Sequence, residues 1–204
     1  TYMRDNGVSY VFSRVDTVAS TPDTLYRVDM TLTGGNAGVT GQRLEQVQSH
    51  TNYFLGHIPQ GVVNVPGFQR LVYPEVYPEI DMQFYSNDKG LKYYFVVRPG
   101  GDADNIVIRY EGSTALNILG TKELSIETPL GNIIQDPGHA YQINPAGNVV
   151  PMPWQAEYIK VSSNEVKFDV RHYPKNMPLI IQVDRGHTQP SSAGAIDNLE
   201  WSTY

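Results

Sequence analysis

Two runs of alternating side chains between residues 80 and 97 constrain the fold more than any other part of the sequence. In the first run, Ile80, Met82 and Phe84 alternate with polar neighbours, and residues 91–97 continue the same period of two. Between them lies SNDKG (86–90), a segment rich in turn formers. A period of two is typical of a half-buried strand, so the two runs predict a β-hairpin.

A third strand is predicted after this hairpin. The segment RPGG (98–101) ends the second strand, because Pro cannot donate to a ladder and Gly admits positive φ. Ile106, Ile108 and Tyr110 then resume the alternation. We therefore expect a three-stranded meander whose apolar, aromatic face is covered by another layer.

The first third of the chain opens with another hairpin signal. Asn6-Gly7 separates Tyr2 and Arg4 from an alternating run over residues 8–12, and Asn-Gly is the strongest short-range hairpin cue. A strand is expected over residues 25–32. Because the sequence starts within a strand signal, we interpret it as an internal fragment.

Residues 34–69 are expected to be mostly irregular. The helical periodicity near residues 43–50 lasts only about two turns, which is marginal for a helix, so residues 34–51 are predicted to be loop or extended. Residues 57–69 contain two Pro and two Gly and predict a long irregular excursion, pinned by Phe54 and Phe68.

Beyond Gly112 the strand signals become short, and turn formers separate them. Candidate strands are residues 116–119, 124–128, 132–135, 140–143, 155–161, 165–170 and 179–183. This pattern predicts an all-β, antiparallel, sandwich-like domain over residues 1–184, with two packed sub-lobes (1–112 and 113–184) as an option. Residues 185–198 are a linker by composition, and LEWSTY (199–204) is expected to begin a following β-repeat domain.

Composition argues against several classes of partner. The 204 residues contain no Cys, which excludes disulfides and thiolate metal sites. The formal net charge is −6 and the 15 basic residues are scattered, so no nucleic-acid partner is expected. No apolar run approaches the ~18–20 residues of a membrane helix, so no membrane insertion is expected.

Three carboxylates are the first candidates for chemistry. Glu75, Glu79 and Asp81 cluster in YPEVYPEID, and glycosidases place two carboxylates ~5–10 Å apart across a sugar. Glu79 and Asp81 share strand parity, which would place them roughly 6–7 Å apart. The simpler interpretation is that both lie on the solvent face of a half-exposed strand.

Other polar candidates are weaker. Asp102, Asp104 and Asn105 offer the hard oxygen ligands of Ca²⁺ but lack the spacing of an EF-hand loop, so a side-chain-capped turn is the simpler interpretation. The histidines show no HxH or HExxH spacing; they are His50, His57, His139, His172 and His187. No catalytic, cofactor-binding or metal-binding residue is therefore assigned, and no cofactor is expected.

Aromatic side chains are the remaining candidates. Six of them would suit a sugar-stacking platform: Tyr73, Tyr77, Tyr85, Tyr93, Tyr94 and Trp154. The simpler interpretation is that they cap the core and fill cross-strand pairs.

Several segments resemble one protein family, in the expected order. They are NYFLG (52–56), the block from Tyr73 to Gly112 (YPEVYPEIDMQFYSNDKGLKYYFVVRPGGDADNIVIRYEG), TPLGNIIQDPGHAYQI (128–143) and PLIIQV (178–183). They resemble the β-rich domain that precedes SBBP-type β-propeller repeats in large secreted bacterial proteins, which are frequent in Bacteroidetes-like bacteria and often carry a type IX secretion sorting domain. The resemblance implies an extracellular or cell-surface location and adjacent propeller repeats, and it supplies no catalytic residues.

The resemblance and the residues together favour a non-catalytic structural or adhesion module of a secreted or cell-surface bacterial protein. Its expected partners are neighbouring domains of the same polypeptide, a second copy, other surface proteins or a glycan. Two alternatives stay open. One is a carbohydrate-binding or glycan-cleaving domain, and the other is a self-assembling subunit of a filament or sheath.

Overall fold

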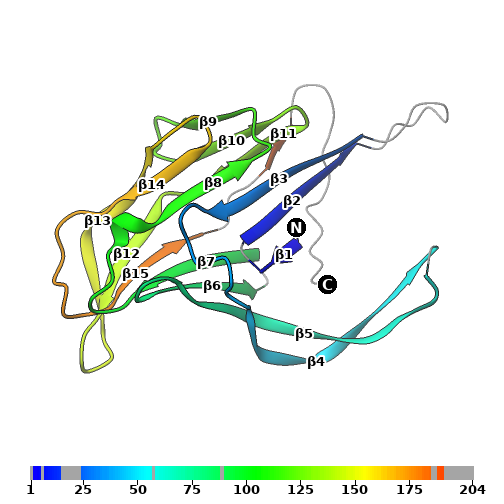
Figure 1. The fold of residues 1–204 in the computed structure, drawn as a ribbon, viewed down its shortest axis with the longest axis horizontal. Helices are drawn as coiled ribbons and strands as arrows, with labels where there is room; N and C mark the ends of the chain where they lie inside the picture. Colours follow the sequence, from blue (N-terminus) through cyan, green and yellow to red (C-terminus); the bar gives the residue numbers. More distant parts are fainter. Residues whose placement is uncertain are drawn as a thin grey trace.

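The structure is a computed structural model that describes residues 2–5, 7–14, 24–56, 58–87, 90–184 and 188–190. Most of these residues lie in strands, which form one sheet of twelve strands and one of four (Figure 1). Every strand pair is antiparallel, and the smaller sheet packs against one face of the larger. The predicted all-β, sandwich-like fold is therefore confirmed.

The order of strands in space differs from their order in sequence. Across the large sheet lie β1 (Tyr2–Arg4), β2 (Gly7–Arg14), β3 (Thr24–Leu32), β8 (Val107–Glu111), β14 (Glu165–Asp169), β13 (Val149–Lys160), β12 (Gly138–Ile143), β15 (Leu179–Val183), β7 (Gly90–Val97), β6 (Ile80–Asn87), β5 (Ile58–Tyr77) and β4 (Gln42–Leu55). The small sheet contains β16 (Thr188–Pro190), β11 (Gly131–Gln135), β10 (Leu124–Thr128) and β9 (Ala115–Ile118). The large sheet thus takes strands from both sides of Gly112.

The predicted central hairpin is confirmed as β6 and β7. Their register pairs Ile80 with Val97 and Met82 with Phe95, so the apolar members of both strands share one face. Ile80 and Phe95 are fully buried there. The period of two therefore gave both the strands and their buried face correctly.

The predicted meander is wrong. On the side away from β6, β7 pairs with β15, whereas β8 pairs with β3 and β14. Residues 98–106 carry the chain away from β7 through a turn and a 3-10 helix, Ala103–Asn105. A short hairpin loop forces the two strands that it joins to pair with each other, whereas a connection of this length does not.

The irregular excursion predicted at residues 57–69 is also wrong, because residues 58–69 belong to the long strand β5; residue 57 lies outside the described residues. β5 accommodates its Pro and Gly through irregular pairing with β4, where the register shifts three times. On the N-terminal side of Arg70, β5 pairs only with β4, so residues 46–56 and 58–68 form a two-stranded projection that we call the arm (Figure 1). Phe54 is 74% exposed on it, so it does not anchor this segment to the core.

The remaining strand predictions hold with shifted ends. The first hairpin forms β1 and β2, and all seven short candidates appear as β9–β15, with β13 extended to include two prolines. Residues 188–190, inside the predicted linker, pair with β11 as β16. LEWSTY (199–204) lies outside the described residues.

No helix in the described ranges has the length and apolarity that a bilayer crossing requires.

Gln135 on β11 joins the two sheets at the centre of the core. Its carboxamide oxygen accepts hydrogen bonds from the hydroxyls of Tyr110 (2.8 Å), Tyr93 (3.2 Å) and Tyr158 (3.4 Å), which come from three strands of the large sheet. Its amide nitrogen lies 3.5 Å from the hydroxyl of Tyr10 on β2. We call these five residues the tyrosine–glutamine cluster.

The tyrosine–glutamine cluster is excluded from solvent. All five side chains are buried, and Tyr110 is 0% exposed. Burial raises the pKa of all four phenols, those of Tyr93, Tyr110 and Tyr158 to well above the usual value. Buried polar groups are costly unless they are paired, so the glutamine and the tyrosines depend on one another.

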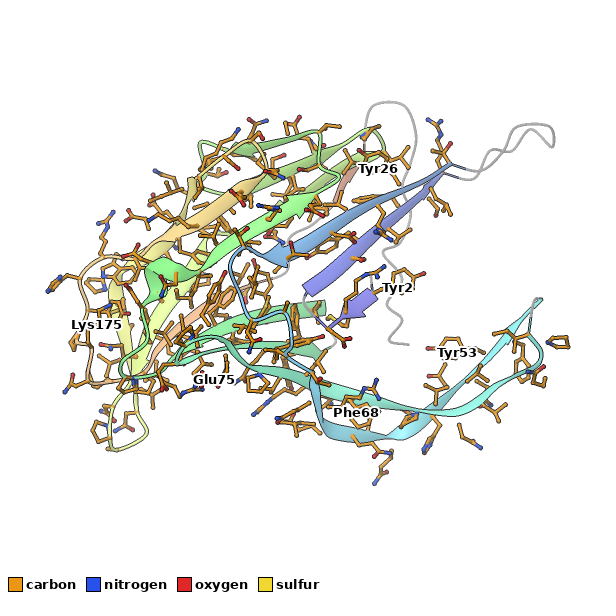
Figure 2. The ribbon with its side chains drawn as sticks, in the orientation of Figure 1. Tyr2, Tyr26, Tyr53, Phe68, Glu75 and Lys175 are labelled. Atoms are coloured by element: carbon orange, nitrogen blue, oxygen red, sulfur yellow. The ribbon has the colours of Figure 1, made fainter. Side chains whose placement is uncertain are left out.

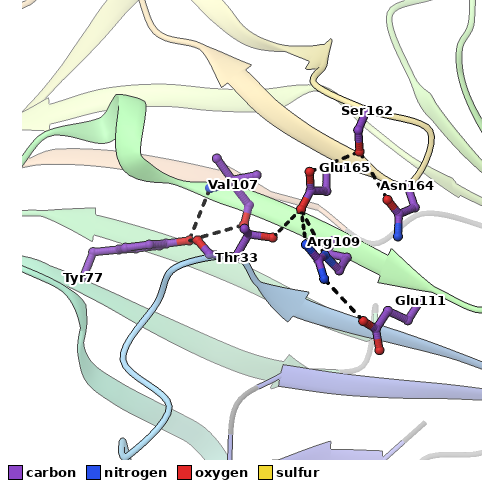
Figure 3. Close-up of polar contacts among 8 residues, drawn as sticks. All are labelled: Thr33, Tyr77, Val107, Arg109, Glu111, Ser162, Asn164 and Glu165. Atoms are coloured by element: carbon purple, nitrogen blue, oxygen red, sulfur yellow. Dashed lines mark hydrogen bonds and ion pairs between the residues drawn. The ribbon is translucent and has the colours of Figure 1, made fainter.

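A second polar connection, centred on Glu165, joins neighbouring strands near the middle of the large sheet (Figure 3). The carboxylate accepts hydrogen bonds from Thr33 (2.7 Å), from Nη2 of Arg109 (2.7 Å) and from Ser162 (3.1 Å). These hydrogen bonds, led by that from Thr33, lower the pKa of Glu165.

We predict that Gln135→Leu lowers the free energy of unfolding by about 3 kcal/mol or more, because three buried hydroxyls lose their acceptor at ~1–3 kcal/mol each. Denaturant unfolding measures it. The matched control, Gln155→Leu on the exposed side of β13, is expected to change stability by less than ~0.5 kcal/mol. Equal stability of the two variants would contradict this role for Gln135.

We also predict that Glu165→Gln destabilises the protein by about 1–2 kcal/mol at neutral pH and by less in acid. Since the folded-state pKa is lowered, this stabilisation is present above the unfolded-state pKa and is lost as pH falls through the folded value. Unfolding free energies across pH 2–7 measure the effect. Glu111→Gln is the control, because the Glu111 side chain is 58% exposed. If the difference in unfolding free energy between Glu165→Gln and the unchanged protein stays constant with pH, the prediction is wrong.

Candidate functional site

The three carboxylates predicted to cluster do so around one cation. Arg98, just after β7, pairs through its Nη1 with Asp81 (2.5 Å), through its Nε with Glu79 (3.0 Å) and through its Nη2 with Glu75. Partial burial raises the pKa of Asp81. Each nitrogen of the guanidinium contacts a different carboxylate, an arrangement typical of a structural ion cluster.

The backbone explains why this cluster sits where it does. Pro78 and Glu79 form the two-residue connection between β5 and β6, with Glu79 at φ 60°. Proline first and positive φ second is the type II turn arrangement, which favours Gly at the second position. Glu75 also has positive φ (54°), where the register of β5 shifts. Arg98 holds both strained residues through their side chains.

Asp102 and Asp104 adopt the side-chain-capped turn that was the simpler interpretation. The Asp102 carboxylate accepts from the backbone N–H of Asp104 (3.3 Å) at the start of the 3-10 helix. Lys175 lies 3.6 Å from Asp102, and Lys167 lies 3.2 Å from Asp104. Each carboxylate thus has its own lysine beside it.

The histidines are not brought together among the described residues. His50 on β4, His139 on β12 and His172 in the connection between β14 and β15 are exposed, whereas His57 and His187 lie outside the described residues. Over the described ranges, no group of three or more His, Asp or Glu side chains is placed to hold a metal ion.

The structure divides the candidate aromatic platform between two faces. Tyr73, Tyr77 and Tyr93 are buried in the core. Tyr85 and Tyr94 are half-buried on the opposite, outer face of the large sheet. Trp154 packs beside the core as a partly buried residue. The six candidate side chains therefore do not form one platform, but two of the tyrosines share a surface.

A hollow on this outer face is the candidate functional site. Tyr85, Tyr94 and Tyr141 line it together with Arg70 and Gln83, around a volume of about 320 Å³. Its remaining lining is apolar and comes from Val96, Ile143 and Ile180. We call this site the outer tyrosine hollow.

Tyr141 was not among the sequence candidates. On β12, Tyr141 and Ile143 alternate with the buried Ala140 and Gln142, so the period of two did carry a signal. That pattern alone cannot tell which partner strands would bring it beside Tyr94. The pairing of β12 with β15, and of β15 with β7, decides it.

The ionic groups around the outer tyrosine hollow are paired. Lys92 lies 3.0 Å from Asp184, and Arg70 lies 3.2 Å from Glu45. Burial raises the pKa of Tyr94 and of Tyr141, so both hydroxyls stay protonated at neutral pH. The site thus presents uncharged hydroxyl and amide groups beside aromatic rings, together with the guanidinium of Arg70, whose Nη1 pairs with Glu45 and whose buried Nε has no hydrogen-bond partner among the described residues.

A larger groove of about 420 Å³ separates the arm from β1. Tyr53, Val65 and Phe68 line its arm side, and Met3 and Arg4 line the other (Figure 2). At its inner end the hydroxyl of Tyr73 donates to the carbonyl oxygen of Arg4 (2.6 Å), which ties β5 to β1 across the bend of the sheet. Burial raises the pKa of Tyr73 to about 12.

We predict that Glu79→Gly is more stable than Glu79→Ala by about 1–2 kcal/mol, because Gly adopts positive φ without the steric cost that a Cβ carries. Both variants lose the contact with Arg98, so their difference isolates backbone strain. At Glu127, within the regular strand β10, the order should reverse, with Gly below Ala by ~0.5–1 kcal/mol. Thermal unfolding measures the stability of the Gly and Ala variants at both positions. If Gly is the more stable variant at both, or Ala at both, backbone strain at Glu79 is refuted.

A family model described as a domain of unknown function (DUF7948) matches residues 1–182. No curated protein and no solved structure matches the chain.

Proposed function

The chain belongs to the DUF7948 family of domains of unknown function, and we propose that it is a non-catalytic module of a secreted or cell-surface bacterial protein, serving adhesion or surface assembly. The proposal includes neighbouring β-propeller repeats of the same polypeptide as partners, following the resemblance described above. The single observation that carries it is the arm.

The arm is built for contact with another surface. A two-stranded ribbon is marginally stable alone in water, and stability usually requires a third strand or a packed face. The arm nevertheless displays large apolar side chains: Phe54, Val62 and Val63 are 74%, 41% and 53% exposed. Exposed apolar side chains gathered on one projecting element favour an interaction surface.

The treatment of the carboxylates supports a structural role. A glycosidase needs one carboxyl group free to give a proton and another free to attack or to activate water. Glu75, Glu79 and Asp81 instead all pair with the single guanidinium of Arg98. Their arrangement is accounted for by the turn that they stabilise.

Two experiments test the proposal as a whole. On intact bacteria that produce the parent protein, added protease should cleave this domain, whereas a cytoplasmic marker should stay intact. The purified domain should show no turnover of a panel of glycans, esters and peptides. A protected domain on intact cells, or turnover of any substrate, would overturn the corresponding part of the proposal.

We predict that replacing Phe54, Val62 and Val63 with Ser, Thr and Thr weakens attachment or assembly by the parent protein about tenfold, equivalent to 1.4 kcal/mol. The fold should persist, because these side chains are exposed. The matched control is Leu25→Ser on β3, which removes a 70% exposed apolar side chain away from the arm. The measurements are attachment of cells to their surface and the melting temperature of each variant. Equal attachment by both variants would contradict the proposal that the arm is an interaction surface.

A further inference from the structure

The outer tyrosine hollow has the layout of a binding site for a flat, hydroxyl-rich molecule. Pairing across the sheet sets Gln83 opposite Tyr94, and Arg70 opposite Tyr85. On the other side, Tyr141 is opposite Ile180. Three rings thus rise from strands β6, β7 and β12 of one continuous sheet.

The floor between the rings is apolar and continuous. Ile180 pairs with Val96 in the register of β15 and β7, and both line the hollow. From β12 to β6 the sheet crosses three strand spacings, or ~14 Å, which is longer than a single sugar ring. An elongated ligand can therefore lie across the strands, with its apolar face on this floor.

The chemistry of the rim selects among ligand classes. Pyranose rings have apolar C–H faces that pack on aromatic rings and hydroxyl edges that hydrogen-bond, and Tyr and Gln supply both kinds of contact. Arg70 in the lining and Lys92 beside it each pair with a carboxylate, Glu45 and Asp184, and the negative charge of these carboxylates disfavours an anionic ligand. A purely apolar ligand would leave the protonated hydroxyls of Tyr94 and Tyr141 without partners.

We propose that the outer tyrosine hollow binds a neutral oligosaccharide across strands β12, β15, β7 and β6. Tyr94, near its centre, supplies the main stacking ring, and Tyr85 and Tyr141 flank it. Gln83 provides an amide that both donates to and accepts from sugar hydroxyls. The site lies on strands other than the arm, so it stands independently of the arm's role in attachment.

The test uses the intact domain and a named set of probes. Neutral oligosaccharides of glucose, mannose, galactose, xylose and N-acetylglucosamine are arrayed beside uronic-acid and sialylated glycans. The best neutral probe is then titrated by calorimetry. We expect binding to neutral members, at least tenfold weaker binding by Tyr94→Ala, and a smaller loss for Tyr94→Phe, which keeps the ring.

Controls separate this site from a folding defect and from the arm. Gln83→Ala should weaken binding while melting stays cooperative, and Phe54→Ala on the arm should leave binding unchanged. Binding to none of the neutral probes, preference for charged glycans, or full binding by Tyr94→Ala would each overturn the proposal. Since Phe54→Ala tests the arm and Tyr94→Ala tests the hollow, failure of one proposal is distinguishable from failure of the other.

Discussion

The fold depends on one buried polar contact, the carboxamide of Gln135 among four tyrosine hydroxyls. The small sheet supplies the glutamine, and strands β2, β7, β8 and β13 of the large sheet supply the tyrosines. Apolar packing alone would permit the small sheet to slide, because hydrophobic contact is non-directional. Hydrogen bonds at the centre of the core have direction, so they fix where the sheets meet, at the risk of several unsatisfied groups if either side moves.

The sequence predicts those features of the fold that depend on neighbouring residues, and it does not predict those that depend on contacts between distant segments. Alternation at Ile80, Met82 and Phe84 identified β6 and its buried face, since a period of two is a local property. The neighbour of β7 is set by contacts between residues 93–97 and 179–183, which no local pattern encodes. The strand β5 was missed because its Pro and Gly suggested a loop, while its irregular pairing with β4 accommodates them.

The same limit applies to the candidate site. Strand parity predicts that Glu79 and Asp81 lie close together, and both contact the same guanidinium. That guanidinium belongs to Arg98, which follows the next strand, β7. Its contacts make the two carboxylates part of an ion cluster instead of a potential catalytic pair. Tyr93 and Tyr94 are adjacent in sequence, and both belong to the aromatic platform that the sequence offers as a candidate. They face opposite sides of the sheet, one toward Gln135 and one toward the outer tyrosine hollow. Only the pairing of β12 with β15 brings Tyr141 to that hollow.

The role of the tyrosine–glutamine cluster is measured most directly by alkaline titration of the tyrosines, followed by phenolate absorbance and by circular dichroism. The folded-state pKa values of the cluster are raised, so their stabilisation is complete below the unfolded-state value of ~10 and is lost as pH rises toward the folded-state values. We predict that part of the 14 tyrosines ionises only together with cooperative unfolding, well above pH 10. Ionisation of all tyrosines near pH 10 with the folded structure retained would contradict it.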